Sequence, residues 1–127
     1  MKHKDQKIQA GVWLDSHTAF VIDNTSDSTK SEYSIQHKVK GNESHSGGSE
    51  HSMNNAKQSD NLKYYKSISS LLLKYDEILL FGPGKAQEQF LNYLKDDAQF
   101  KSKRMTIANT QQLTEPQIIA KVREQFS

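Results

Sequence analysis

The sequence predicts an α/β protein in which one mixed sheet of five strands is covered by helices on both faces. Two observations predict this class. Short runs rich in β-branched and aromatic residues come first, and amphipathic helical segments alternate with further apolar runs after them. The predicted order is β-β-β-α-β-α-β-α. A three-stranded antiparallel meander that continues into right-handed crossovers gives a three-layer α/β/α arrangement.

The first third of the chain predicts three strands. Residues 10–15 and 17–23 are dense in β-branched and aromatic side chains, with Trp13 expected in the core. A tight turn at Asp15 joins them. Residues 32–39 alternate between apolar and polar types, which is typical of a half-buried third strand. The side chains expected on its buried face are Tyr33, Ile35, His37 and Val39.

The rest of the chain predicts three helices and two strands. Helical spacing indicates helices over 62–75, 85–95 and from Thr114 onward, and the apolar runs 77–81 and 104–108 are the strands between them. The side chains expected on the buried faces of the helices are Leu62, Tyr65, Ile68, Leu71, Leu72 and Tyr75, then Ala86, Phe90, Leu91 and Leu94, then Ile118, Ile119, Val122 and Phe126, with Tyr64 expected at the surface.

The last helix has a strong start signal. Thr114 is a good N-cap, Pro116 suits the first turn, and Gln117 stands where a capping box needs its second member. The complete order of elements is that of a ribonuclease H-like fold.

Composition limits the function classes. The 127 residues correspond to about one domain, which we expect to span 1–127. The chain has no cysteine, so thiolate chemistry is excluded, and it lacks an apolar run of membrane-spanning length. A net charge of +2, spread along the chain, gives no clustered basic face for DNA. We expect a cytoplasmic protein without cofactor, metal or membrane contact.

Residues 41–59 differ in character from the rest. Gly, Ser, Asn, His, Glu and Gln dominate, so this segment buries too little apolar surface to order itself, and it is predicted as a flexible loop. A loop of this length is commonly either functional or a linker. Its candidate functional residues are His45, Gly47, Gly48, Ser49 and His51.

Three segments resemble a known group of small bacterial proteins called translational machinery proteins. Residues 12–19, VWLDSHTA, resemble their "VWIDH-x-A" start. Residues 80–86, LFGPGKA, resemble their "GP-x-x-AK" turn, and residues 114–120, TEPQIIA, resemble their closing helix. The resemblance covers nearly the whole chain outside the loop, and it implies a role in translation.

That group is in turn similar to the middle domain of archaeal and eukaryotic class I peptide-chain release factors, which has a ribonuclease H-like fold. Residues 81–90 resemble the "GGPGP-x-K-x-x-F" turn of those factors, and Gly47-Gly48 stands where they carry a Gly-Gly-Gln loop. Here Ser49 replaces the glutamine, and the basic residues that follow that motif in the family are absent. The resemblance therefore implies the fold and a ribosomal context, without release activity.

Catalytic chemistry has little support in the residues. Two-metal hydrolysis needs several converging carboxylates, and Asp15 finds no partner at the end of the strand 77–81 or on the helix 62–75. His37, His45 and His51 match no recognised metal-ligand spacing. Gly82, Gly84 and Lys85 lie at a predicted helix N-terminus, where free N–H groups favour an anion, although a tight turn explains these residues equally well.

These observations favour a binding protein rather than an enzyme. The first expectation is a non-catalytic translation-associated protein that contacts the ribosome or RNA. The alternative is a small-molecule or protein-binding domain that uses the glycine-proline turn and has no link to translation. A hydrolase acting through the loop histidines is the third.

Overall fold

The computed structural model describes residues 7–29, 32–41 and 62–126. The strands are β1 (Gln9–Leu14), β2 (Thr18–Asp23), β3 (Ser34–Lys40), β4 (Glu77–Gly82) and β5 (Arg104–Asn109). Residues 62–72 are helical, and they are followed by α2 (Ala86–Lys95), the short 3₁₀ turn η2 (Ala98–Phe100) and α3 (Glu115–Phe126).

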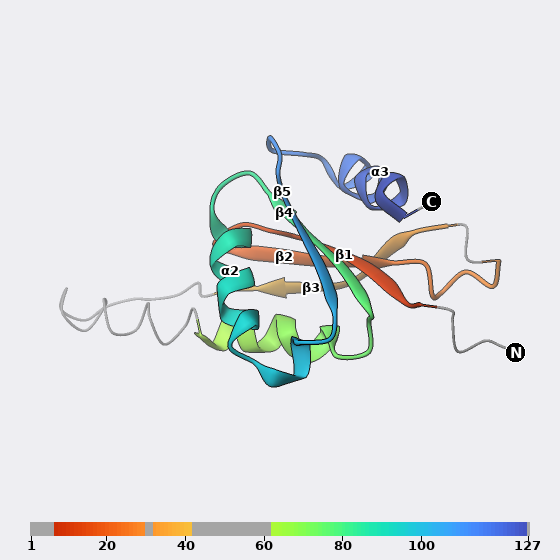
Figure 1. The fold of residues 1–127 in the computed structure, drawn as a ribbon. Helices are drawn as coiled ribbons and strands as arrows, with labels where there is room; N and C mark the ends of the chain where they lie inside the picture. Colours follow the sequence, from red (N-terminus) through yellow and green to blue (C-terminus); the bar gives the residue numbers. More distant parts are fainter. Residues whose placement is uncertain (1–6, 30–31, 42–61, 127) are drawn as a thin grey trace, which may run out of the picture.

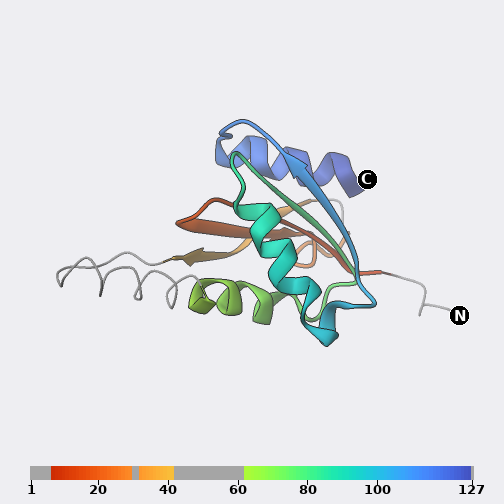
Figure 2. The same cartoon turned by 60° about the vertical axis from the view of Figure 1, so that its left-hand side comes forward.

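The five strands form one sheet in the order β3-β2-β1-β4-β5 (Figure 1). β1 pairs antiparallel with β2, and β2 pairs antiparallel with β3. β4 lies parallel to β1, and β5 lies parallel to β4. Figure 2 shows α3 on one side of the sheet and α2 with the helix of residues 62–72 on the other. The predicted meander, the mixed sheet and the three-layer α/β architecture are confirmed.

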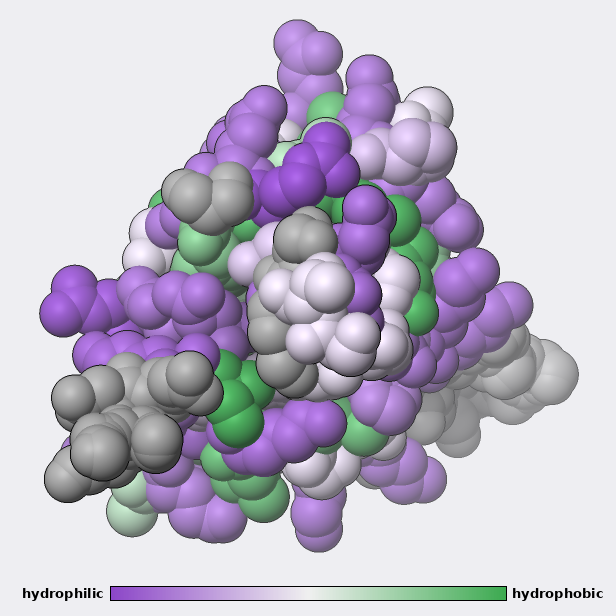
Figure 3. Space-filling model, turned by 90° about the vertical axis from the view of Figure 1, so that its right-hand side faces the viewer, coloured by the Kyte–Doolittle hydropathy of each residue, from purple (hydrophilic) through white to green (hydrophobic). Residues whose placement is uncertain are grey.

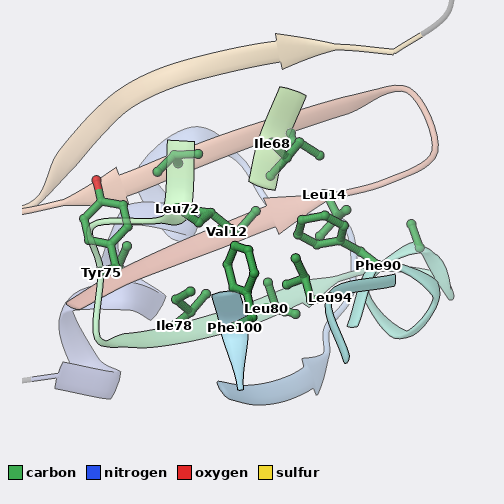
Figure 4. Close-up of a cluster of buried hydrophobic side chains, with 14 of the residues drawn as sticks. Val12, Leu14, Ile68, Leu72, Tyr75, Ile78, Leu80, Phe90, Leu94 and Phe100 are labelled. Carbon is green, nitrogen blue, oxygen red and sulfur yellow. The ribbon is translucent and has the colours of Figure 1, made fainter. Parts of the chain in front are cut away.

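The larger hydrophobic core lies between the sheet and the two helices on that second side. Alternate residues of β1 and β4 point into it, as the two-residue period of a strand requires (Figure 4). Phe100 of η2 closes the core at one margin and is 1% exposed. The buried residues labelled in Figure 4 are Val12, Leu14, Ile68, Leu72, Tyr75, Ile78, Leu80, Phe90, Leu94 and Phe100.

The smaller core lies under α3. Trp13 is buried there as predicted, 3% exposed, and its ring stacks on Phe20 at a centroid distance of 5.4 Å. Gly11 allows α3 to approach β1, because a Cβ at this position would lie 2.3 Å from a methyl of Val122. The predicted capping box is present: the Thr114 N–H donates to Gln117 Oε1 (2.9 Å), and the Gln117 N–H donates to Thr114 Oγ1 (3.4 Å).

The expected face of β3 is wrong. The register with β2 shifts between Val21, which is opposite His37, and Ile22, which is opposite Ile35. Gln36 is therefore the extra residue of a β-bulge, and alternation is broken there. As a result Ile35 packs against the core under α3, Val39 packs against the larger core, and His37 is exposed.

The expected buried stripe of the first helix is also wrong at its start. Tyr64, expected at the surface, is 3% exposed, whereas Leu62, expected in the core, is 58% exposed. The centre of the buried stripe runs through Tyr64, Ile68 and Leu72, and Tyr65 is only partly buried. A contact distant in the sequence, described below, fixes Tyr64 in this position.

Candidate functional site at the carboxyl end of the sheet

Four strands end on the same side of the sheet. β1 and β3 are both antiparallel to β2, so they run in the same direction, and β4 and β5 share that direction. The ends of β1, β3, β4 and β5 therefore lie along one edge of the sheet, which we call the carboxyl end and which runs from the left (β3) to the top (β5) in Figure 1. Open α/β sheets commonly bind ligands at this end.

The turn between β1 and β2 is fixed by Asp15. Its Oδ1 accepts hydrogen bonds from the N–H groups of His17 and Thr18, both at 2.8 Å. A further backbone bond runs from the Asp15 N–H to the Thr18 carbonyl at 3.0 Å. The carboxylate is therefore engaged within its own turn, and the prediction that Asp15 is a turn former is confirmed.

Two residues that flank the range 42–61 are anchored to this turn. The Gly41 N–H donates to the carbonyl of His17 at 2.6 Å, and the Tyr64 hydroxyl donates to the carbonyl of Asp15 at 2.9 Å. Burial, then the Asp15 carboxylate and Tyr65, raise the pKa of Tyr64 above its ordinary value of 10.0. The Tyr64 hydroxyl is therefore protonated at neutral pH and can donate this hydrogen bond. Gly41 and Tyr64, on either side of residues 42–61, are thus both bonded to the β1–β2 turn.

The turn after β4 packs directly against the end of β1. Gly82 is buried, and a Cβ at this position would lie 2.1 Å from the carbonyl oxygen of Leu14, so the backbone requires glycine for close approach. The buried side chain of Gln87 supports the turn, because its Nε2 donates to the carbonyls of Gly82 (3.1 Å) and Ala108 (3.2 Å). The β1–β2 turn and the β4–α2 turn are therefore neighbours.

The start of α2 is exposed. Lys85 is its N-cap and makes no side-chain capping bond, and both Gly84 and Lys85 are solvent-exposed. The Glu88 N–H already donates to the Lys85 carbonyl at 3.1 Å. The N–H groups of Ala86 and Gln87, which precede it, have no acceptor within an α-helix, so they and Lys85 could contact an anionic group at this end. Asn109 Nδ2 donates to the carbonyl of Gly84 at 2.8 Å, which holds the turn against the end of β5.

The predicted site residues divide into two groups. Gly82, Gly84 and Lys85 lie together in the β4–α2 turn, as the sequence indicates. His45, Gly47, Gly48, Ser49 and His51 lie outside the described residues, as does the predicted loop beyond Gly41.

Sequence reasoning did not find two residues of this end. Gln87 is polar and wholly buried, a combination that hydrophobic periodicity does not detect. Tyr64 gave a weak signal, since it lies four residues before Ile68 on the same helical stripe.

The described residues contain neither a metal-binding cluster nor a membrane-spanning helix. No group of three or more His, Asp or Glu residues there is arranged to hold a metal ion. No helix in this part of the chain has the length and apolar character needed to cross a bilayer.

Comparisons with known proteins identify similar structures. No protein-family model matches the chain, and no curated protein sequence matches it. Pelota from Archaeoglobus fulgidus is similar with a TM-score of 0.61 at 10% identity, over 96% of this chain and 32% of that one. Pelota from Thermoplasma acidophilum gives 0.57 at 16% identity, over 91% and 31%. The archaeal translation termination factor aRF1 gives 0.58 at 12% identity, over 94% and 35%.

The chain thus spans about a third of the length of each of these proteins. At such low identities the likeness concerns the fold, and it covers nearly all of the elements described above. This chain has the α/β fold found in part of Pelota and of aRF1.

Proposed function

We propose that this chain is a non-catalytic, translation-associated protein that binds the ribosome or RNA through the carboxyl end of its sheet. One observation carries the proposal: 94% of the chain follows the fold of part of a translation termination factor. The motif resemblances at residues 12–19, 80–86 and 114–120 favour the same context. A cytoplasmic location fits this role.

The residues that would make the contact belong to two segments. Lys85 and the N–H groups at the start of α2 would meet phosphate. Gly82 allows the turn to approach β1 closely, and the space around Gly84 is open. The second segment contains His45, Gly47, Gly48, Ser49 and His51. Since Gly41 and Tyr64 are both bonded to the β1–β2 turn, this segment would leave and rejoin the fold beside the first one.

Ser49 separates this proposal from peptide release. In the Gly-Gly-Gln motif the glutamine positions the reacting group, and a serine side chain is too short to reproduce its reach. Binding without hydrolysis is therefore the expected behaviour.

Sedimentation with ribosomes tests the proposal. The protein should move with ribosomal particles in a sucrose gradient at low salt, and the bound fraction should fall as salt rises, because phosphate contacts release counterions. Lys85→Ala should lower the bound fraction, whereas Lys95→Ala, which removes the same charge from the other end of α2, should leave it nearly unchanged. A protein that stays at the top of the gradient at low salt contradicts the proposal and favours the small-molecule or protein-binding alternative.

The predicted organisation has a separate test. We propose that 1–127 is one domain with a flexible loop at 41–59. Limited proteolysis should then cut first within 41–59 and leave two fragments that remain associated through the sheet. Initial cleavage within β4 or α2 would contradict this organisation.

A further inference from the structure

The two edge strands of the sheet differ in how they are protected. β3 carries the bulge at Gln36 and two exposed lysines, Lys38 and Lys40. Bulges and lysines are devices that prevent an edge strand from pairing with another chain. β5 has neither: its register with β4 is regular over all six residues, and Arg104 at its first position is its only charged residue.

β5 also exposes side chains suited to a partner. Thr106 is exposed, and Ile107 is 37% exposed. Within the described residues, Ile107 is the one exposed large hydrophobic that belongs to a strand; the others are Ile8, Leu62 and Leu73. No described strand lies beyond β5 (Figure 2).

We propose that β5 pairs antiparallel with β5 of a second copy of this chain, with Thr106 opposite Thr106 on a two-fold axis perpendicular to the sheet. This axis keeps each face of the sheet continuous with the same face of the partner. Met105 of each copy then lies opposite Ile107 of the other, which buries the exposed isoleucine. Facing threonine and apolar pairs both stabilise antiparallel strands. The inference does not depend on the proposed function.

Charge favours antiparallel over parallel pairing. The basic residues Lys101, Lys103 and Arg104 all lie at the start of β5. Antiparallel pairing places Arg104 opposite Ala108 and Lys103 opposite Asn109, so like charges do not face each other. Parallel pairing would bring the two basic clusters together, which is unfavourable. Two antiparallel copies of β5 thus place compatible residues opposite each other along the strand. This self-complementarity is the reason to infer that the partner is a second copy of the chain.

Cysteine cross-linking tests the register, because the chain has no cysteine of its own. In Thr106→Cys the two thiols would lie on directly opposite residues, about 5 Å apart at Cβ. In Ile107→Cys they would be diagonal, about 7 Å apart, beyond the span of a disulfide. Under mild oxidation Thr106→Cys should form a covalent dimer about tenfold faster than Ile107→Cys. His37→Cys on β3 is the matched control at the other edge and should be equally slow.

Sedimentation equilibrium tests the association itself. The wild-type mass should rise from 14.5 kDa toward twice that value as concentration increases. Thr106→Lys, which sets two lysines opposite each other, should abolish this rise, whereas His37→Lys should not. Circular dichroism checks that both variants are folded.

A wild-type protein that stays monomeric up to about 1 mM overturns the inference, because even a weak dimer is populated at that concentration. This holds even if β5 then binds another protein. Preferential cross-linking through His37→Cys or Ile107→Cys overturns it as well.

Discussion

The two ends of the sheet are held together by different means. At the amino end, to the right and bottom of the sheet in Figure 1, charged side chains connect elements that are far apart in the sequence. At the carboxyl end, backbone contacts at Gly41 and Gly82 and the three uncharged side chains of Tyr64, Gln87 and Asn109 do so. The difference separates an end held by charged groups from the end at which binding is proposed.

The amino end contains a dense network. Asp23 is wholly buried, and its carboxylate accepts hydrogen bonds from the Thr25 N–H (3.0 Å), the Thr25 hydroxyl (2.9 Å) and the Tyr75 hydroxyl. Lys103 donates to the carbonyls of Leu73 (2.7 Å) and Tyr75, so its charge lies just beyond the C-terminal end of the helix of residues 62–72, where a positive charge is favourable. The surface seen from this side is mostly hydrophilic, with small separate hydrophobic patches (Figure 3).

The carboxyl end has no equivalent network among the described residues. The Asp15 carboxylate accepts hydrogen bonds from two N–H groups of its own turn, and the Lys85 side chain makes no capping bond. Gly82 and Gly41 lie in close backbone contact with the β1–β2 region instead. Lys85 is thus left exposed where four strands end, as the proposed contact at this end requires.

Removing the buried carboxylate should have the largest effect. Asp23→Ala leaves the Tyr75 hydroxyl without its acceptor and deprives Thr25 of two bonds, so we expect a loss of about 3 kcal/mol in the free energy of unfolding. Chemical denaturation measures it. Glu124→Ala removes a carboxylate from an exposed position on α3 and should change the stability by less than about 0.5 kcal/mol. Equal effects of the two variants would show that the amino-end network does not stabilise the fold.

Closing the space at Gly82 should come next. Gly82→Ala places a methyl 2.1 Å from the Leu14 carbonyl oxygen, and the backbone of β1 cannot rotate away as a side chain could. We expect a loss of about 2 kcal/mol by denaturation. Gly84→Ala, where nothing lies within 4 Å of the new Cβ, is the matched control and should be neutral or slightly stabilising. If both variants leave the free energy of unfolding unchanged, the backbone of the β4–α2 turn does not pack against Leu14 as closely as described.

The parts of the fold that were predicted correctly depend on local chemistry. The capping box of α3 requires only Thr114 and Gln117, three residues apart, and both of its bonds are present. The Asp15 turn is equally local. The apolar run that became β4 is buried on both faces, so its composition alone identified it.

The wrong predictions depend on contacts between distant residues. Tyr64 is buried because its hydroxyl reaches Asp15, 49 residues away. The β3 bulge follows from pairing with β2, and the alternating pattern of residues 32–39 contains no sign of it. In the candidate site, the glycine-proline turn was visible in the sequence, but its position beside the β1–β2 turn results from the parallel pairing of β1 with β4.

The Tyr64 anchor makes a smaller and pH-dependent contribution. Its pKa is raised, so its stabilising effect is complete below pH 10 and is lost as the pH rises above that value. Tyr64→Phe should cost about 1 kcal/mol at pH 8 by loss of the bond to Asp15. From pH 10 to 11 the variant should lose less stability than the wild type does. Unfolding measured at each pH, with tyrosinate absorbance at 295 nm, checks this, and parallel pH profiles would contradict it.

The ion pair between β3 and α3 should have the smallest effect. Lys38 Nζ lies 3.3 Å from Glu115 Oε2, but the two side chains are 56% and 50% exposed, so solvent screens the pair. Lys38 also lies over the ring of Phe20, 5.6 Å from its centroid. A double-mutant cycle with Lys38→Ala and Glu115→Ala should give a coupling of about 0.3 kcal/mol that disappears in high salt. Lys38→Ala should cost more than Glu115→Ala, because only the lysine also covers Phe20. A coupling above about 1 kcal/mol would mean that this exposed ion pair stabilises the α3 side as effectively as a buried hydrogen bond does. Charged contacts would then stabilise a face of the sheet as well as its amino end.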